Sequence, residues 1–268
     1  MQKNFIEDTL PLLESHSENP DFISAFARGL VIFQVLSVSK KALTISDISK
    51  ITEFPRASVR RGLYTLLTMG FVHQEDRYYE LTSKVLILAH SYITSQTLPN
   101  AAQPILESIT RKLDEASSMA VLVQNEIIYI ARSSENTQRI MSNTLTIGSH
   151  LPAYCTSMGR VLLAAESPEK QRSVLNESKL KAYTEKTIYE TEALLTELAQ
   201  VKAQGYAIID QELELGLCSI AVPVYDKSGK TIAAINVSTH AMRNGVMEMK
   251  AKFLPELLTS SAILTTFI

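Results

Sequence analysis

The sequence predicts an α+β protein with an N-terminal winged helix-turn-helix, a linker helix and a second domain in which helices flank antiparallel strands. Three observations lead to this class. Residues 22–82 contain three short helical patterns followed by a β-hairpin pattern, residues 83–97 keep apolar side chains at helical spacing, and residues 98–268 alternate helix and strand patterns. The 268 residues suffice for two domains of about 100–200 residues each.

The composition excludes several classes of protein. Hydrophobic residues make up 46% and charged residues 20% of the chain, which is the balance of a folded protein. The first twenty residues are acidic and contain prolines, unlike a secretory signal, and every apolar run is far shorter than the roughly 18 residues that span a bilayer. We therefore expect a cytoplasmic protein without a membrane partner. The two cysteines, Cys155 and Cys218, are too few for a metal cluster and are expected to be buried thiols.

The net charge of −2 is unevenly distributed along the chain. Residues 1–21 carry one lysine and five acidic residues, whereas residues 22–72 carry seven basic residues and two acidic ones. We interpret the first segment as an acidic N-terminal tail. The second segment is interpreted as part of a surface that meets a polyanion.

The winged helix-turn-helix is expected to begin with a helix over residues 22–38, where large apolar side chains recur at helical spacing. These side chains are Phe26, Leu30, Phe33 and Leu36. A second, short helix follows, because Thr44 and Asp47 have the spacing of a capping box. Its inward-facing side chains are expected to be Ile45, Ile48 and Ile51.

A third helix is expected to start at Pro55, since proline suits the first helical position. Its apolar residues fall in one arc and should pack on the other two helices. They are Val59, Leu63, Leu66, Leu67 and Gly70. Residues 71–82 then contain two short strand-like runs around a polar turn, which predicts a β-hairpin.

The outer side of the third helix carries guanidinium groups and small hydroxyls. Such a face can enter the major groove of DNA, where arginine contacts base edges or phosphates. The residues concerned are Arg56, Arg60, Arg61 and Tyr64. A solvated face of a helical bundle is the open alternative, and the adjoining hairpin and local positive charge favour DNA binding.

In the second domain we expect a helix at 105–113, a hairpin of strands at 119–123 and 127–133, and a helix at 156–166 that starts from a Thr/Ser cap. A longer helix should follow at 190–205, closed by Gly205. The remaining strand patterns cover 206–210, 218–226 and 231–239.

The sequence shows no catalytic or metal-binding signature, so no cofactor or metal is expected. Neither glycine-rich phosphate-binding motif occurs, the five histidines lack metal-ligand spacing, and Ser157 is not in a G-x-S-x-G elbow. Instead, Tyr154, Thr156 and Ser157 lie where a loop enters a helix, and free N–H groups at such a position suit a small anion.

Further polar residues support a ligand site in the second domain. Asn236 and Ser238 face the same way because they are two apart on one strand, and Arg139 can pair with a carboxylate through two hydrogen bonds. A few convergent donors in a small cavity are typical of a metabolite site. For each of these residues, capping a helix or a strand end is the open alternative, and Asp210 fits either reading.

Four segments resemble the IclR family of bacterial transcriptional regulators, in the family's order and spacing from about residue 22 to the C-terminus. They are FARGLVIFQVL, LTISDISKITEFPRASVRRGLYTLLTMGFV, LPAYCTSMGRVLLAA and GYAIIDQELELGLCSIAVPVYDKSGKTIAAINVSTH. RIMS, LPAYCTSMGRVLLA and INVSTH resemble more narrowly the Pca-type regulators of the β-ketoadipate pathway.

The resemblance implies a homodimer or homotetramer in which a linker helix joins the winged helix-turn-helix to a GAF-like effector-binding domain. It implies an activator of aromatic-acid catabolism genes whose partners are double-stranded DNA, a small carboxylate such as protocatechuate or β-ketoadipate, and RNA polymerase. The family's DNA contacts fall on Arg56, Ser58, Arg60 and Arg61, with Arg28 near the backbone. Its effector contacts fall on Ser157, Met158, Leu217, Ser219, Asn236 and Ser238.

Two departures from the family pattern concern the ligand. Other branches have a Gly-Ala pair in place of Ser157 and Met158, and this difference disfavours pyruvate- or glyoxylate-type ligands. Cys218 stands where close relatives usually have arginine, which predicts altered sensitivity if that arginine contacts the effector or a neighbouring subunit.

Two other hypotheses about the function stay open. One is an enzyme acting on an aromatic acid with a fused DNA-binding domain, for which no acid/base pair is recognisable. The other is an architectural DNA binder without a ligand.

Overall fold

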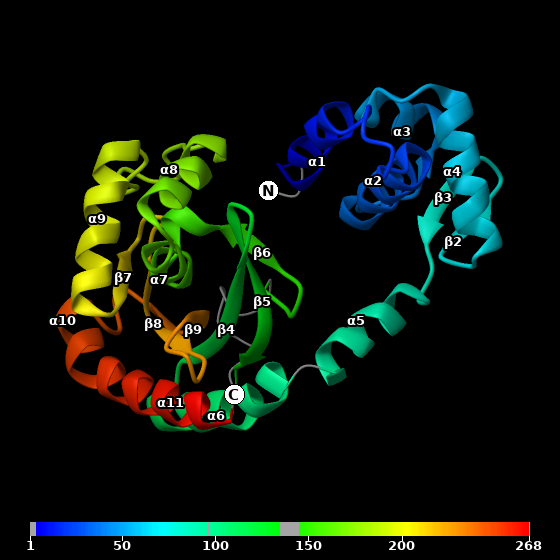
Figure 1. The fold of residues 1–268 in the computed structure, drawn as a ribbon. Helices are drawn as coiled ribbons and strands as arrows, with labels where there is room; N and C mark the ends of the chain where they lie inside the picture. Colours follow the sequence, from blue (N-terminus) through cyan, green and yellow to red (C-terminus); the bar gives the residue numbers. More distant parts are fainter. Residues whose placement is uncertain (1–3, 96, 135–144, 268) are drawn as a thin grey trace. The chain divides into compact units, whose positions relative to one another are not determined.

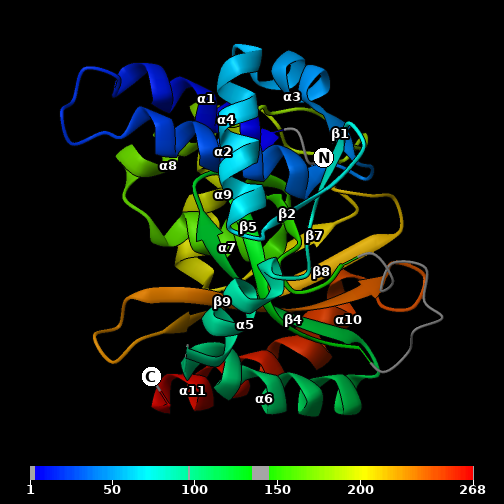
Figure 2. The same ribbon diagram turned by 90° about the vertical axis from the view of Figure 1, so that its right-hand side faces the viewer.

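The computed structural model describes residues 4–95, 97–134 and 145–267, with side chains described for 9–91, 97–134 and 145–267. The chain divides into two compact units, Met1–Tyr92 and Ile93–Ile268. Each unit combines helices with an antiparallel sheet, so the predicted α+β class is confirmed (Figures 1 and 2).

The first unit is a winged helix-turn-helix preceded by an additional helix. Its helices are α1 (Asn4–Ser15), α2 (Ser24–Val38), α3 (Ile45–Thr52) and α4 (Arg56–Thr68), and α5 (Val85–Ser95) follows the hairpin. The strands β1 (Leu43–Thr44), β2 (Val72–Glu75) and β3 (Tyr78–Leu81) form an antiparallel sheet in the order β1-β3-β2. The segment interpreted as a tail contains α1, and its Leu10 and Leu13 pack against the core of this unit.

The core of the first unit differs from the predicted one in the face that α2 buries. Val31, Ile32 and Val35 are buried, whereas Phe26 is 65% and Leu30 48% exposed. The reason is the close crossing of α2 and α4 at Gly62, where a Cβ atom would lie 2.5 Å from Cδ1 of Ile32. The predicted inward position of Ile51 on α3 is also wrong, because that side chain is exposed while Ile48 is buried.

The termini of α3 and α4 follow the local sequence. Asp47 N–H donates to Oγ1 of Thr44 at 3.2 Å and Thr44 N–H donates to Oδ2 of Asp47 at 3.0 Å, so the predicted capping box is confirmed. Pro55 is the N-cap of α4, which starts one residue later than expected and has no side-chain cap. The connection between the two helices turns at Glu53, which has a φ of 60°.

The second unit is built on a six-stranded antiparallel sheet in the order β6-β5-β4-β9-β8-β7. Its strands are β4 (Ala116–Val123), β5 (Glu126–Ser133), β6 (His150–Pro152), β7 (Ala207–Asp210), β8 (Leu217–Tyr225) and β9 (Thr231–His240). Its helices are α6 (Thr97–Leu113), the 3-10 turn η1 (Ala153–Cys155), α7 (Ser157–Ala165), α8 (Pro168–Glu177), α9 (Thr191–Gln204), α10 (Val246–Glu248), the π-helical η2 (Met249–Phe253) and α11 (Leu254–Thr266).

Helices cover both faces of this sheet (Figure 1). α7, α8 and α9 pack on one face around Ala120, Ala221 and Ala234, and α6 and α11 pack on the other. The helices and strands expected in this unit are all present, while β6, η1, α8, α10, η2 and α11 were not anticipated. The linker helix predicted over 83–97 is α5, which ends at Ser95, and Leu98 and Pro99 lie in the first turn of α6, where proline is tolerated.

No described helix has the length and apolar character that crossing a membrane requires.

Candidate DNA-binding and effector sites

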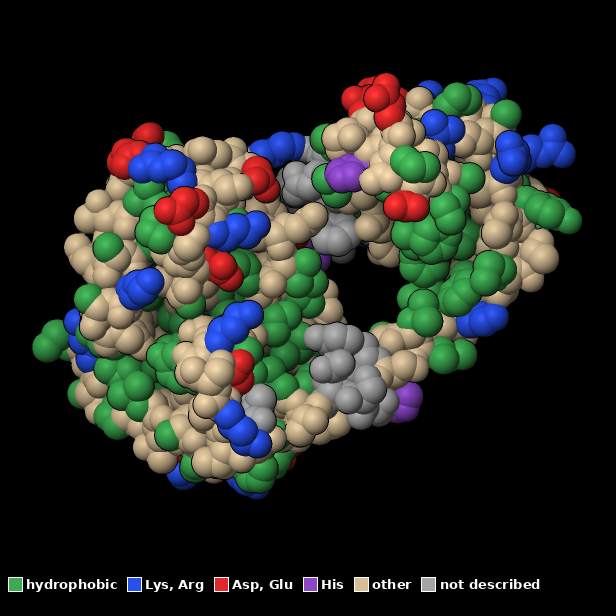
Figure 3. Space-filling view, viewed as in Figure 1, with side chains coloured by type: hydrophobic (Ala, Val, Ile, Leu, Met, Phe, Trp, Pro, Cys, Tyr) green, Lys and Arg blue, Asp and Glu red, His purple; other side chains and the backbone are tan. Residues whose placement is uncertain are grey.

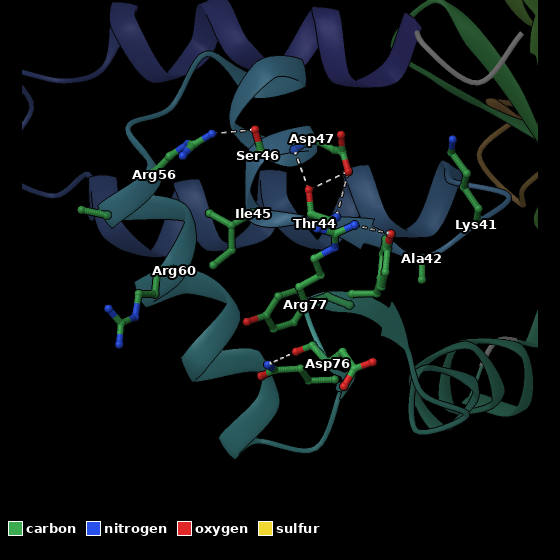
Figure 4. A pocket seen from close by; sticks show the side chains of 14 residues that line it. Lys41, Ala42, Thr44, Ile45, Ser46, Asp47, Arg56, Arg60, Asp76 and Arg77 are labelled. Atoms are coloured by element: carbon green, nitrogen blue, oxygen red, sulfur yellow. Dashed lines mark hydrogen bonds between the residues drawn. The ribbon is translucent and has the colours of Figure 1, made fainter.

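A groove of about 1060 Å³ runs between the N-terminal ends of α3 and α4 and the β2–β3 hairpin (Figure 4). Four basic side chains line it. They are Lys41, Arg56, Arg60 and Arg77. Two carboxylates, Asp47 and Asp76, also line the groove, so basic side chains outnumber acidic ones by four to two. A surface with such an excess of basic side chains can contact phosphates.

The predicted DNA-binding side chains of α4 lie on its outer face. Arg56, Arg60, Arg61 and Tyr64 are exposed, whereas Ser58 is half-buried. Nη2 of Arg56 donates to Oγ of Ser46 at 2.8 Å, which fixes its direction across the groove. No described acidic side chain forms an ion pair with Arg60 or Arg61. The uncapped N-terminus of α4 adds N–H groups that favour an anion.

Arg28 lies in α2 and is exposed. Its guanidinium carbon is 5.7 Å from the centroid of the Phe54 ring, which orients the side chain towards the start of α4. A contact of Arg28 with the DNA backbone stays a prediction.

Arg77 was not singled out from the sequence, although it occupies the turn of the predicted hairpin. Its guanidinium lies 5.3 Å from the centroid of the Tyr78 ring, and its Nη2 donates to the Tyr78 hydroxyl at 3.3 Å. The side chain is thereby held over the groove, as Figure 4 shows. A basic residue at a hairpin turn beside a basic helix was the signal that could have identified it.

In the second unit, α7 begins where a Thr/Ser cap was expected. Oγ1 of Thr156 accepts a hydrogen bond from the N–H of Gly159 at 3.3 Å. A Cβ atom at Gly159 would lie 2.1 Å from the carbonyl oxygen of Ala153, so only glycine lets η1 pack this closely on α7. This packing buries Ser157 and Met158, which are each 1% exposed, beside the sheet.

Two buried polar atoms of the second unit lack a hydrogen-bond partner among the described residues. They are Oγ of Ser157 and Oδ1 of Asn236. An unsatisfied buried polar group costs about 1–3 kcal/mol, and such groups are rare in native proteins. Polar atoms of a ligand would satisfy both, so these two atoms mark a candidate ligand site.

The register of the strands places the other predicted effector residues on the face of the sheet that α7 covers, here called the α7 face. Asn236 pairs with Ala221, and Ser238 pairs with Ser219 on the neighbouring strand. Since Ala221 belongs to the cluster packed under α7, alternation places Leu217, Ser219, Asn236 and Ser238 on the same face. Nδ2 of Asn236 donates to Oγ of Ser238 at 3.1 Å, which leaves the unpartnered Oδ1 as an acceptor.

Arg132 of β5 is a polar residue of this face that the sequence patterns did not predict. It pairs across the sheet with Ser118, which in turn pairs with Asn236 on β9, so the three residues form one row. Nη1 of Arg132 donates to Oγ of Ser118 at 2.9 Å, and burial lowers the pKa of the guanidinium. No described acidic side chain pairs with it. An arginine inside the apolar strand IIYIARS was the signal that could have identified it.

Three predicted effector residues, Arg139, Asp210 and Tyr154, are not assigned to this candidate site. Arg139 lies outside the described residues. Asp210 pairs with Cys218, whose side chain belongs to the cluster on the α6 face, and hydrogen bonds headed by that from Lys186 lower the pKa of Asp210 to about 2. The Tyr154 hydroxyl is already bonded to the backbone of Lys181, at 2.9 Å as donor and 3.1 Å as acceptor.

Cys155 and Cys218 are both buried free thiols, as expected, and burial raises the pKa of each to about 12. Among the described residues, no group of His, Cys, Asp and Glu side chains could hold a metal ion.

A basic winged helix followed by a second unit with a candidate ligand site defines a DNA-binding regulator with a sensory domain. Comparison with known families agrees with this class. Residues 25–76 match the IclR helix-turn-helix domain, and residues 90–264 match the domain described as bacterial transcriptional regulator IclR C-terminal. The chain therefore belongs to the IclR family of transcriptional regulators.

Individual relatives show which members of the family this chain resembles. The chain is 47% identical over 249 residues to the Pca regulon regulatory protein of Pseudomonas putida, covering 93% of this chain and 85% of that protein. It is 32% identical over 226 residues, 83% of each protein, to the p-hydroxybenzoate hydroxylase transcriptional activator of Acinetobacter baylyi. The predicted likeness to Pca-type regulators is thus confirmed, and the relatives are regulators and not enzymes.

A solved structure shares both units. The crystal structure of an IclR homolog complexed with 4-hydroxybenzoate, from Microbacterium hydrocarbonoxydans, is 26% identical and superposes with a TM-score of 0.75 over 91% of this chain and 98% of that chain.

Proposed function

We propose that this protein activates aromatic-acid catabolism genes in the cytoplasm, binding operator DNA through α4 and the β2–β3 hairpin under control of a small carboxylic acid bound beside α7. The observation that carries the proposal is the row of Arg132, Ser118 and Asn236 on strands that α7 packs against. The unpartnered Oδ1 of Asn236 lies in this row, and the unpartnered Oγ of Ser157 lies at the start of α7. The relatives support it, since they include Pca and p-hydroxybenzoate regulators and a homolog complexed with 4-hydroxybenzoate.

The chemistry of this row suits an acid such as protocatechuate, 4-hydroxybenzoate or β-ketoadipate. Arg132 offers a guanidinium without a described acidic partner, and a carboxylate can accept two hydrogen bonds from such a group. Oδ1 of Asn236 is an acceptor, so a ligand hydroxyl or a bound water can donate to it. The N–H groups at the start of α7 favour a second anionic oxygen.

A ligand screen tests the proposal directly. The purified full-length protein would be heated with protocatechuate, 4-hydroxybenzoate or a linear diacid, with the uncharged 4-hydroxybenzyl alcohol as a matched control. An acid present at 100 times its Kd is expected to stabilise the folded state by about 2.7 kcal/mol. A melting temperature that no acid raises above that with the alcohol contradicts a carboxylate site.

Ser157→Ala is expected to weaken binding of the effector by about 1 kcal/mol, because it removes one hydrogen-bonding group from the buried site. Operator binding without effector should be unchanged. Isothermal titration calorimetry measures the first quantity and a mobility-shift assay the second. Ser173→Ala, at an exposed position of α8, is the control, and an isotherm of Ser157→Ala equal to that control would remove Ser157 from the site.

Arg61→Ala is expected to weaken operator binding by about 1–3 kcal/mol if the side chain contacts a base. The expectation follows from its exposed position on the outer face of α4. The affinity would be measured by mobility shift at matched salt, with Lys227→Ala in the second unit as a control for the change in net charge. Equal affinities of the two variants would take Arg61 off the list of base contacts.

The protein is also proposed to pair with a second copy through the first unit, as a homodimer or within a homotetramer. Large apolar side chains are exposed on α2 and α5, and Figure 3 shows hydrophobic surface over the first turns of α5. They are Ile23 at the N-cap of α2, Phe26 and Leu30 on α2, and Leu86, Ile87 and Leu88 on α5. Exposed apolar patches mark interaction sites, and paired winged helices bind two operator half-sites.

The double variant Leu86→Glu and Leu88→Glu is expected to sediment as a smaller species than the wild type, because two buried carboxylates would oppose association. Analytical ultracentrifugation measures the effect. Ile147→Glu, in the second unit, serves as the control. A double variant with an unchanged sedimentation coefficient would exclude this face from the interface.

Contacts with RNA polymerase are a further proposal for an activator bound at a promoter.

A further inference from the structure

The C-terminal end of α4 leaves backbone carbonyl groups that the helix itself does not satisfy. Gly70, with a φ of 76°, reverses the chain, and its N–H donates to the Leu67 carbonyl at 2.9 Å while Phe71 N–H donates to the Leu66 carbonyl at 2.9 Å. These two bonds are those of a Schellman motif. The next carbonyls along the chain, those of Met69, Gly70 and Phe71, lie beyond α4 and are not bonded within this motif.

The residues that follow the hairpin supply donors to these carbonyls. Thr82 donates from Oγ1 to the Gly70 carbonyl at 2.7 Å and from its N–H to the Phe71 carbonyl at 2.9 Å. Nζ of Lys84 donates to the Met69 carbonyl at 2.6 Å and lies 4.9 Å from the centroid of the Phe71 ring. A cation at a helix C-terminus also interacts favourably with the helix dipole.

Thr82 and Lys84 also form the start of α5. The Thr82 carbonyl accepts from Val85 N–H at 3.3 Å, and the Lys84 carbonyl accepts from Ile87 N–H at 3.1 Å. The N–H of Lys84 donates to Oγ1 of Thr82 at 3.3 Å. The same two residues therefore hold the end of α4 and set the direction in which α5 leaves the first unit.

We propose that Thr82 and Lys84 are positioning residues that couple the orientation of α5 to that of α4 on DNA. The chain passes from the first unit to the second through α5, so this junction lies on the covalent path between the proposed effector site and the DNA-binding helix. Two residues bonded to consecutive carbonyls at one end of α4 transmit a reorientation of α5 directly. The claim that these residues transmit the effect of a ligand rests on the proposed effector response. The claim that they position α4 on DNA rests on DNA binding alone.

The test uses the full-length protein, a duplex selected by the wild type from a random-sequence library, and an unrelated duplex. Thr82→Val removes the bond from Oγ1 to the Gly70 carbonyl at nearly constant size, and Thr82→Ser keeps it. We expect Thr82→Val to lose about tenfold in affinity for the selected duplex, with binding of the unrelated duplex unchanged and Thr82→Ser close to the wild type. Selected-duplex affinity of Thr82→Val equal to that of Thr82→Ser would overturn the positioning role.

Lys84→Met provides a second variant and separates positioning from a direct phosphate contact. If Lys84 acts by contacting phosphate, both duplexes lose affinity and the salt dependence falls by about one charge, which overturns the proposal for this residue. If it positions α4, only the selected duplex loses affinity, and Lys84→Arg restores it. A variant that binds neither duplex and unfolds at a lower temperature has lost its fold. The affinities of Thr82→Val then decide whether this junction positions α4.

The coupling is read from the change in selected-duplex affinity that protocatechuate or 4-hydroxybenzoate produces. We expect the change to be smaller in Thr82→Val than in the wild type. An equal change in both proteins overturns the coupling. A wild type that responds to neither acid contradicts the proposed function instead, and the positioning role is still decided by affinities measured without any acid.

Discussion

Glu212→Gln is expected to lower the free energy of unfolding of the second unit by about 3 kcal/mol. Arg160 of α7 is 1% exposed and Glu212 6% exposed. Two hydrogen bonds join them, Nη1 to Oε1 at 2.8 Å and Nη2 to Oε2 at 2.6 Å. Glutamine removes the negative charge and one of the two acceptor oxygens, and it leaves the buried guanidinium facing an amide. Breaking one side of a buried ion pair costs about 3–5 kcal/mol, and Glu197, 3.5 Å from Arg160, keeps the loss near the lower value.

This pair also fixes the segments around the proposed effector site. Nε of Arg160 donates to the Tyr154 carbonyl at 3.0 Å, and Oε2 of Glu212 accepts from the N–H of Ile188 at 3.0 Å. The guanidinium thus bonds η1 and the loop before β8, and the Glu212 carboxylate bonds the segment before α9. Glu212→Gln should therefore loosen the site as well as lower stability.

Urea unfolding followed by circular dichroism measures the stability, analysed as separate transitions if the two units unfold separately. Glu197→Gln is the matched control, because that carboxylate is partly exposed and should contribute about 1 kcal/mol or less. If the two variants lose the same stability, the Arg160–Glu212 pair is not the principal contact. Operator binding without effector should survive in both, since neither residue belongs to the first unit.

The sequence predicted the winged helix-turn-helix well because its signals are local. The Thr44–Asp47 capping box and the apolar arc of α4 depend only on residue spacing. The capping box is present, and Val59 and Leu63 of the arc are buried, while Gly70 lies beyond the helix and is exposed. The buried face of α2 could not be found in this way. Phe26 and Leu30 have helical spacing, but the approach of Ile32 to Gly62 on another helix decides which face is buried.

The candidate effector site was predicted in part for a similar reason. Alternation along one strand is a local rule, and it correctly put Asn236 and Ser238 on one face. Whether residues of different strands share a face depends on register, which single-sequence patterns do not contain. Register places Arg132 in the row of Asn236 and puts Asp210 opposite Cys218 on the other face.

Arg132→Met is expected to weaken binding of the acid effector by about 2–3 kcal/mol, or roughly 30- to 150-fold in Kd. Methionine keeps an unbranched side chain of similar length between the strands but removes every donor and the positive charge. The loss should appear for carboxylates only. Weak binding of the uncharged 4-hydroxybenzyl alcohol should be unchanged, because its hydroxyls do not need a cation.

Arg132→Lys separates charge from geometry at this position. Lysine keeps a positive charge but cannot offer two parallel N–H groups to a carboxylate, so its affinity should lie between those of methionine and arginine. Calorimetry with protocatechuate on the three proteins gives this order directly. A variant that bound the acid as tightly as the wild type would show that the carboxylate lies elsewhere on this face of the sheet.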